Sequence, residues 1–245
     1  MNEMIENLLS HRSIRKFKSK QLNQQQIEAI IHSALHASTS SYMMAYSIIG
    51  VTDENKKEQL AEITGQTYVK HNGHFLLFCA DLNRVTVKAV SDEYENMLDN
   101  LENSEHFLVS AIDAALAAQN AAIAAESMGL GICYIGSIRN NIAAVDELFH
   151  LPKHVIPLFG MAIGYPAHHP ESKPRLPIDA VYFENGYQDH ENALDRFDER
   201  IGKYYAKRSE NNRKDTWTDQ MKRRFQKTIR MDVTDHVKNK GFNKK

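Results

Sequence analysis

The sequence is poor in cysteine and carries almost no net charge, and both features exclude classes of protein. Cys79 and Cys133 lie far apart in apolar runs without CxxC spacing, so neither a disulfide scaffold nor a zinc site is expected. The 30 basic and 31 acidic side chains nearly cancel, and the molecule therefore lacks a long-range field that would attract nucleic acid or an anionic membrane. We expect buried thiols in a reducing cytoplasm, and any anion site must be local.

Common catalytic motifs are also missing. No Walker, HExxH or GxSxG pattern occurs, which removes the usual signatures of ATPases, zinc proteases and serine hydrolases. The glycines of "SMGLGICYIGS" fail as a dinucleotide loop, because Tyr134 stands where the third glycine is required and because they enter a strand instead of leaving one. His168 and His169 are adjacent without further ligands at useful spacing, so no metal site is expected.

Long hydrophobic runs are scarce. The N-terminal "MNEMIENLLS" contains two acids and no apolar segment long enough for a signal peptide. Residues 107–129 approach the length of a membrane span, but they are mostly alanine and include Asp113, Gln119, Asn120 and Glu126. Because these polar groups would be costly in lipid, we expect a helix buried inside the protein or at a subunit interface.

What is present is an alternation of helical and strand patterns. Ile27, Ile30 and Ile31 recur at helical spacing behind Asn23 and Gln26, which are placed as a capping pair. Apolar runs that begin at Tyr46, His74, Gly131 and Val155 predict strands, and helices are expected over Glu54–Thr64, before Gly129 and from Asn140. This alternation favours an α/β or α+β layered domain.

The chain changes character after residue 164. Residues 164–177 contain four of the six prolines, so regular structure is not expected there. From Ala193 onward sixteen Lys and Arg face eight Asp and Glu, which gives this tail a charge of +8 and the preceding body −9. A cationic tail and an anionic body suggest that the tail wraps its own core or a second subunit. Nucleic-acid binding is the alternative, but stacking aromatics are sparse and Trp217 is the only tryptophan.

Positive charge is concentrated in "SHRSIRKFKSK", residues 10–20. The run follows a short amphipathic helix carrying Met4, Ile5, Leu8 and Leu9, which we expect to anchor it to the core. Arginine forks match phosphate oxygens, although a solvated run of charge fits equally well. A second basic stretch, "SKPRLP", and the hydroxyl-rich "ASTSSYMMAYS" are further candidates for ligand contact.

Together these segments resemble the nitroreductase superfamily, in its branch of NADPH-dependent flavin reductases and oxygen-insensitive nitroreductases. The matching stretches follow the family order and cover essentially the whole chain. They are "HRSIRKF", "ASTSSYMMAYSIIGVTD", "ITGQ", "FLLFCADLNR", "DAALAAQNAAIAAESMGLGICYIGSIRNN", "LPKHVIPLFGMAIGYP", "KPRLP" and "NNRKDTWTDQ".

The resemblance implies an α+β nitroreductase-like fold with a central mixed, mainly antiparallel sheet flanked by helices. It implies one FMN-binding domain over residues 1–245, with a core to about residue 180 and a C-terminal extension over about 181–245 that embraces the partner subunit. It also implies a cytoplasmic homodimer with two FMN molecules in clefts between the subunits.

The resemblance also implies the site residues. The FMN phosphate and ribityl chain are matched by His11, Arg12, Ser13, Arg15 and Arg175. Ser38, Thr39, Ser40 and Gln66 match contacts from the other subunit or at the ring edge, although Thr39 replaces a common serine. Tyr134, Ile135, Gly136 and Ser137 match the segment against the isoalloxazine, and Lys173 matches a cation at its pyrimidine end, where it would stabilise the reduced flavin.

NADPH and the acceptor are matched by a separate set of residues. Arg208 and Arg213 match arginines for the 2′-phosphate of NADPH, Arg230 matches a substrate-facing arginine, and Ser41, Tyr42 and Met43 line the acceptor side. The implied mechanism is ping-pong transfer of two electrons from NADPH, or NADH, through FMN to nitroaromatics, nitrofurans, quinones or free flavins. Because FMN carries the chemistry, no catalytic side chain is expected. An enzyme of the same fold that acts mainly as an NAD(P)H oxidase or disulfide reductase is the alternative.

Overall fold

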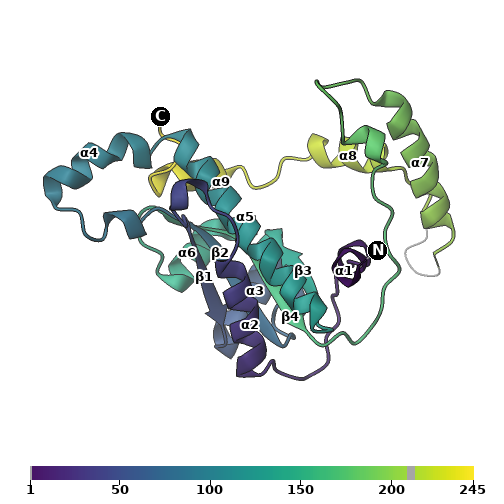
Figure 1. Cartoon of the computed structure of the whole chain (residues 1–245), viewed down its shortest axis with the longest axis horizontal. Helices are drawn as coiled ribbons and strands as arrows, with labels where there is room; N and C mark the ends of the chain where they lie inside the picture. The colour runs from purple at the N-terminus through teal and green to yellow at the C-terminus, as the bar shows by residue number, and fades with distance from the viewer. Residues whose placement is uncertain (1, 209–212) are drawn as a thin grey trace. The chain divides into compact units, whose positions relative to one another are not determined.

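The computed structural model describes residues 2–208 and 213–245, and these form two compact units. The first unit runs to Glu171 and resumes with Arg230–Lys245, and the second is Ser172–Ile229. The boundary lies inside the proline-rich stretch where the sequence predicts a break. Figure 1 traces the chain through its elements.

A four-stranded sheet forms the centre of the first unit, in the order β1-β2-β4-β3. The strands are β1 (Tyr46–Val51), β2 (His74–Asp81), β3 (Gly131–Ile135) and β4 (Val155–Gly164). Each begins at the residue where the sequence predicts a strand. All three pairings are antiparallel, so the parallel pairing implied by a mixed sheet is not found within the described residues.

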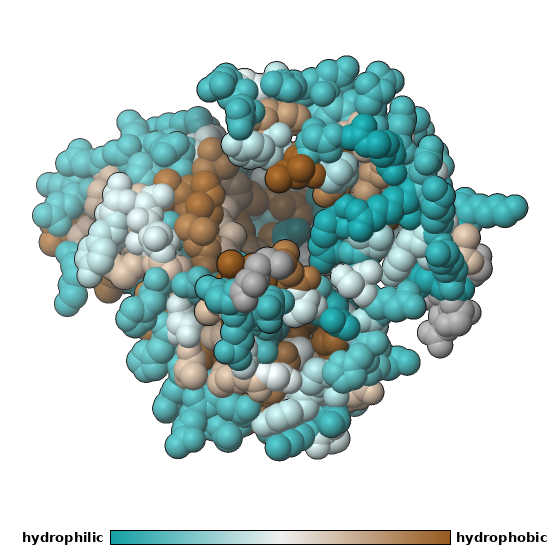
Figure 2. All heavy atoms as spheres, turned by 45° about the vertical axis from the view of Figure 1, so that its right-hand side comes forward, coloured by the Kyte–Doolittle hydropathy of each residue, from teal (hydrophilic) through white to brown (hydrophobic). Residues whose placement is uncertain are grey.

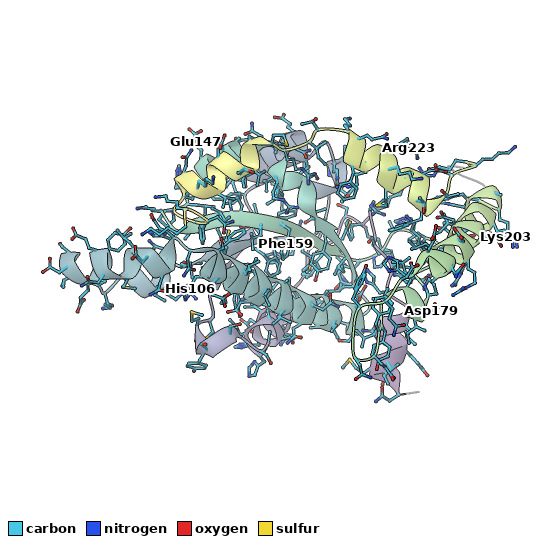
Figure 3. The ribbon with its side chains drawn as sticks, turned by 90° about the horizontal axis from the view of Figure 1, so that it is seen from above. His106, Glu147, Phe159, Asp179, Lys203 and Arg223 are labelled. Carbon is cyan, nitrogen blue, oxygen red and sulfur yellow. The ribbon has the colours of Figure 1, made fainter. Side chains whose placement is uncertain are left out.

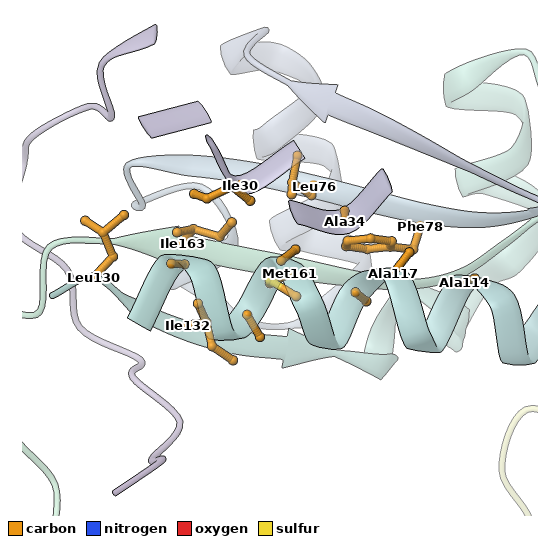
Figure 4. Close-up of a cluster of buried hydrophobic side chains, with 14 of the residues drawn as sticks. Ile30, Ala34, Leu76, Phe78, Ala114, Ala117, Leu130, Ile132, Met161 and Ile163 are labelled. Atoms are coloured by element: carbon orange, nitrogen blue, oxygen red, sulfur yellow. The ribbon is translucent and has the colours of Figure 1, made fainter. Parts of the chain in front are cut away.

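One face of the sheet is covered by α2 (Gln24–Leu35) and α5 (Ser104–Ser127). Both helices begin with an asparagine cap, and Asn23 forms the predicted capping box with Gln26. Alanines from α5 pack against Ile30 and Ala34 of α2 and against strand residues such as Phe78 (Figure 4). Because alanine is small, the helices and the sheet approach closely.

The opposite face of the sheet is covered by α3 (Glu54–Thr64) and α6 (Ile142–Phe149). Leu60 of α3 and Val145 of α6 pack with Phe75, Leu77 and neighbouring apolar residues of the sheet. The two helical layers leave the sheet buried on both sides, as expected for strands that are apolar throughout.

The remaining helices lie at the edges of the first unit or in the second. In the first unit, α4 (Ser91–Leu101) precedes α5, and α9 (Asp232–Asn239) contributes Val237 to a smaller apolar cluster with Leu101 and Ile156. In the second unit, α7 (Glu191–Ala206) and α8 (Trp217–Gln226) form a small core of their own.

The expectation that the first helix is anchored to the core is wrong. The helix forms as α1 (Glu3–Leu9), but none of its residues is buried, and Met4, Leu8 and Leu9 are all exposed. The reason is that α1 meets one side of α5, while its apolar side chains remain without cover in the single chain. The basic run is held instead by its own backbone, through the hydrogen bond from the Ile14 N–H to the Ile132 carbonyl.

Helix α5 is long and apolar enough to cross a membrane by length and composition. Its environment agrees with the predicted buried helix instead, because nine of its residues are buried within the fold, among them Ser110 and Asp113. Asp113 is hydrogen-bonded to backbone N–H groups of the loop before β1.

Gly160 in β4 provides a test of how tightly the sheet is packed. A Cβ at this position would lie 2.3 Å from Cζ of buried Phe75, so Gly160→Ala should destabilise the fold by about 1–3 kcal/mol through overpacking. Urea denaturation measures the change. Gly202→Ala in α7 is the matched control, because a Cβ placed there would meet nothing within 4 Å and alanine favours the helix. Wild-type stability in Gly160→Ala would contradict this description of the sheet.

Candidate functional site

The basic run lies along the end of the sheet in the first unit. The Ile14 N–H donates to the Ile132 carbonyl of β3 at 2.9 Å, and Phe17 forms a bridge with Pro166. Gly131 permits this approach, since a Cβ there would lie 2.4 Å from Cγ1 of Ile14. The backbone of residues 11–17 is therefore fixed beside β3, which carries the predicted flavin-facing segment.

His11 and Arg12 line one cavity of about 310 Å³ with Asn7, Glu126 and Gly129. His11 Nδ1 lies 2.7 Å from Glu126 Oε1. Arg12 donates only to the carbonyls of Ser10 and Pro170, and among the described residues it has no carboxylate partner. The side-chain N–H₂ of Asn7 is buried there without a hydrogen-bond acceptor.

Four predicted residues meet in a second cluster, which we term the Arg15 network. Gln66 Nε2 donates to Ser137 Oγ at 3.0 Å, and the Tyr68 hydroxyl donates to Gln66 Oε1. The Cys133 thiol lies 3.8 Å from the Tyr68 hydroxyl oxygen. Arg15 interacts electrostatically with both Tyr68 and Cys133, and Ser13 interacts with Cys133. The members of the network are Ser13, Arg15, Gln66, Tyr68, Cys133 and Ser137.

Burial governs ionisation in this network. It raises the pKa of Tyr68 to about 12, reinforced by Cys133 and opposed by Arg15. It also raises the pKa of the Cys133 thiol, again against the charge of Arg15. Burial raises the pKa of the other thiol, Cys79, to about 12. Both cysteines are free and buried, so neither offers a thiolate nucleophile near neutral pH.

The segment from Tyr134 to Ser137 also carries an aromatic ring, on the face of β3 that is turned toward α5, where the Tyr134 hydroxyl donates to Gln119 Oε1 at 3.4 Å. Tyr134 is 37% exposed, and its ring meets the edge of Phe159 with 5.7 Å between centroids. Phe159 lies on β4 near the middle of the sheet (Figure 3). Ile135 is buried in the core and Gly136 begins a short 3₁₀ helix, Gly136–Asn141. The segment thus presents Tyr134 outward while Ile135 anchors it.

Arg230 lies at the far end of this 3₁₀ helix. Its Nε donates to Asn140 Oδ1 at 3.0 Å. Burial lowers the pKa of neighbouring Arg139, and the positive charge of Arg230 lowers it further. Neither guanidinium has a carboxylate partner within residues 2–208 and 213–245, so the two cations form an uncompensated pair.

The loop from Ser38 to Ala45 presents hydroxyls and an exposed ring. Ser41, Tyr42 and Met44 all have left-handed φ values, between 48° and 57°, which cost about 1–2 kcal/mol each outside glycine. Tyr42 is 83% exposed. Ser38 and Thr39 form no side-chain hydrogen bond with any described residue, and no hydrogen bond between described residues joins this loop to the Arg15 network.

The second unit gathers the other predicted cations around two tyrosines. Lys173 Nζ lies 5.8 Å and Arg213 Cζ 4.1 Å from the centroid of the Tyr205 ring, and Arg208 Cζ lies 5.6 Å from that of Tyr204. Arg175 donates to the Lys173 carbonyl at 3.1 Å. Residues 209–212, between Arg208 and Arg213, lie outside the described residues.

Electrostatic contacts distinguish these cations. Arg213 lies 3.6 Å from Asp215 Oδ2 and donates to Gln220 Oε1 at 3.0 Å. Burial would raise the pKa of Tyr205, but hydrogen bonds from Arg213 and Lys173 and their charges lower it. Arg208 has no carboxylate partner in the described part of the chain.

The sequence analysis did not assign a role in the site to five residues that the structure places there or beside it, namely Tyr68, Cys133, Arg139, Asp113 and Tyr205. The one local signal that could have identified Tyr68 is its position two residues after Gln66.

Family models match almost the entire chain. The one described as "Nitroreductase family" matches residues 8–165, and "Nitroreductase family, C-terminal domain" matches residues 173–245. The chain belongs to the nitroreductase family. The junction between the two matches falls at the boundary of the two structural units.

Curated proteins and solved structures of this nitroreductase family resemble the chain over its full length. FMN reductase (NADPH) of Bacillus subtilis is 50% identical, and the match covers 100% of both chains. The oxygen-insensitive NADPH nitroreductase of Salmonella typhimurium is 43% identical over 99% of each. The structure of NfrA1 nitroreductase from B. subtilis has a TM-score of 0.95 at 49% identity, covering 99% of this chain and 100% of that one.

The donors of the basic run, in the cavity beside Arg12 and in the Arg15 network, fit a flavin mononucleotide. Arg12 and Arg15 have no carboxylate partners among the described residues, and the buried Asn7 amide offers an unused donor. Donors and cations without acids are the groups that bind phosphate. Glu126 is the one acid that lines the cavity within the described part of the chain, and its Oε1 lies 2.7 Å from Nδ1 of His11.

Proposed function

We propose that this protein is an FMN-dependent NADPH oxidoreductase that reduces nitroaromatics, nitrofurans, quinones or free flavins by a ping-pong mechanism. Its membership of the nitroreductase family and its full-length identity to an NADPH-dependent FMN reductase make NADPH-dependent flavin or nitro reduction its activity. The structural observation that supports this best is the Arg15 network, in which residues distant in sequence meet around a cation that has no acidic partner among the described residues.

We assign the FMN phosphate and ribityl chain to His11, Arg12, Ser13, Arg15 and Arg175. The backbone of residues 11–17 is held against β3, which preorganises the guanidinium groups and lowers the entropic cost of binding. Bound FMN would supply the two-electron chemistry that links NADPH oxidation to reduction of the acceptor. No acid–base side chain is then required.

The flavin ring is assigned to the segment from Tyr134 to Ser137. Tyr134 offers an exposed ring for stacking, and Ser137 and Gln66 offer polar atoms at the ring edge. Ser38, Thr39 and Ser40 would contribute from the partner subunit, which explains why their loop has no described hydrogen bond to the Arg15 network in one chain. Lys173 would stabilise the negative charge of the reduced ring.

Arg208 and Arg213 are assigned to the 2′-phosphate of NADPH. They differ in their surroundings, because Asp215 lies beside Arg213 whereas Arg208 has only the Tyr204 ring as a described charge contact. We therefore expect Arg208 to contribute more of the preference for NADPH over NADH. Arg230 and the loop residues Ser41 and Tyr42 are assigned to the acceptor.

A homodimer is supported by the apolar surface of the first unit. Leu108, Ile112 and Leu116 recur every fourth residue on the exposed side of α5 and are 43–53% exposed. Helix α1, which contacts α5, carries further exposed apolar residues, Met4, Ile5, Leu8 and Leu9. Figure 2 shows apolar side chains among a mostly hydrophilic exterior. An apolar stripe of this kind marks an association surface, which we assign to a second copy embraced by the C-terminal extension.

The two buried, unpaired thiols are consistent with a cytoplasmic enzyme.

Flavin content and bleaching test the proposed function. The purified protein should be yellow, lose its flavin absorbance when NADPH is added without oxygen, and regain it when a nitrofuran follows. Arg15→Ala should raise the Kd for FMN about 10–100-fold, because hydrogen bonds to charged groups contribute about 1.5–3 kcal/mol. Absorbance spectra and quenching of FMN fluorescence measure both effects.

Lys18→Ala is the control for Arg15→Ala, since Lys18 is an exposed cation of the same run outside the network. It should retain wild-type FMN affinity. A colourless protein that takes up no added FMN would overturn the function, and equal affinities in both variants would remove Arg15 from the site.

Nucleotide preference tests the assignment of Arg208. Arg208→Ala should lower kcat/KM for NADPH about tenfold and leave kcat/KM for NADH unchanged, because only NADPH carries the 2′-phosphate. Steady-state kinetics with both nucleotides measure the ratio. The neighbouring exposed cation gives the control Lys207→Ala, and an unchanged ratio in Arg208→Ala would show that the assignment is wrong.

Association along α5 is tested by charge. The double variant Ile112→Glu and Leu116→Glu should convert the dimer to a monomer and reduce FMN retention, because charges cannot be buried unpaired at the interface. Light scattering after size exclusion measures the mass. Val87→Glu, at an exposed valine outside the stripe, should remain dimeric, and a dimeric double variant would refute this interface.

A further inference from the structure

Asp113 is a buried carboxylate whose role neither the flavin chemistry nor the core explains. It lies midway along α5 and is 0% exposed. Within the described residues it forms no ion pair, so no cation offsets its burial. A carboxylate in such a position must be stabilised by hydrogen bonds.

Those hydrogen bonds come from the two ends of one loop. Asp113 Oδ1 accepts from the Ser40 N–H at 3.0 Å, and Oδ2 accepts from the Ala45 N–H at 3.1 Å. Between these two residues lie the three with left-handed φ values, Ser41, Tyr42 and Met44. One carboxylate therefore clasps a six-residue loop at its start and its end.

The carbonyl side of the same loop is held independently. Arg84 donates to the Met44 carbonyl at 2.9 Å and to the Tyr46 carbonyl at 3.1 Å. These contacts fix only the C-terminal end of the loop. Among the described residues, the Ser40 end, where the hydroxyl-bearing residues lie, is held by Asp113 and by one hydrogen bond within the loop, from the Met43 N–H to the Ser40 carbonyl.

We propose that Asp113 is a positioning residue for the flavin and the acceptor, acting through the loop Ser40–Ala45. By fixing the Ser40 backbone, it sets the direction of the Ser38–Ser40 hydroxyls and holds Tyr42 exposed in its left-handed conformation. The inference rests on the proposed function, because that function assigns these residues to FMN and the acceptor. Without the carboxylate, Ser41, Tyr42 and Met44 would relax to ordinary backbone conformations.

Asp113→Asn tests the proposal with the shape of the side chain preserved. One oxygen becomes an N–H₂ group facing a backbone N–H, so one end of the clasp is lost. We expect the Kd for FMN to rise about tenfold and, at saturating FMN, the KM for nitrofurazone to rise by a similar factor. The rate of anaerobic flavin reduction by NADPH should change less than about threefold, since Arg208 and Arg213 lie on other elements.

Ser110→Ala is the matched control. Ser110 is also 0% exposed on α5, but within the described part of the chain its hydroxyl donates only to the Phe107 carbonyl of the same helix. A purely structural role for a buried polar group of α5 would lower the unfolding temperature in both variants and leave the Kd and KM unchanged. A higher Kd and KM in Asp113→Asn alone supports positioning, and wild-type values in that variant overturn it.

Amide hydrogen exchange in the wild-type protein decides the case even if Asp113→Asn does not fold. The Ser40 and Ala45 amides should exchange at least about tenfold more slowly than that of exposed Tyr42, and equal rates would overturn the clasp. A wild-type protein that binds no FMN would overturn the proposed function and this role together. Normal FMN binding by both wild type and Asp113→Asn would overturn the role of Asp113 alone.

Discussion

The packing of α5 against the sheet is the constraint on which the rest of the first unit depends. Its buried alanines allow the helix to lie close to both α2 and the strands, and larger side chains in these positions would separate the layers. The helix thereby positions three different parts of the structure. Its polar core residue Asp113 reaches the loop before β1, its C-terminal end leads into β3 and the Tyr134 segment, and its outer face carries the apolar stripe.

Much of this scaffold follows from local sequence signals. The strands are continuous apolar runs because both faces of the sheet are covered, and the Asn23 cap with Gln26 marks the start of α2 in a way that needs no tertiary information. Helix α4 also has a usable signal, since Tyr94, Met97, Leu98 and Leu101 recur at helical spacing, although it is not among the helices predicted from the sequence. These features depend on neighbours within a few residues.

The candidate site could be predicted from the sequence less completely than the scaffold, for a physical reason. Tyr68 and Cys133 are ordinary core residues by sequence, and they join Arg15 only because residues 11–17 lie beside β3. Asp113 looked like a polar interruption in an alanine helix, and its partners are main-chain groups that no residue pattern reveals. For α1 the sequence predicted more burial than the structure shows. An amphipathic pattern predicts that the apolar face of a helix will be covered, but it does not specify whether the same chain covers it.

The partners of the cations separate structural charges from those available to a ligand. Arg223 places Nη2 2.8 Å from both oxygens of Asp215, and Lys244 lies 2.6 Å from Glu102, so these charges are satisfied within the fold. Among the described contacts, Arg12, Arg15, Arg139, Arg208 and Arg230 instead meet carbonyls, hydroxyls, rings or an amide, none of which neutralises a guanidinium. A folded chain keeps several arginines uncompensated at a cost in solvation and mutual repulsion. Anionic ligands remove that cost, and for this reason we assign the FMN phosphate to Arg12 and Arg15, and the larger share of 2′-phosphate binding to Arg208, in preference to the basic tail as a whole.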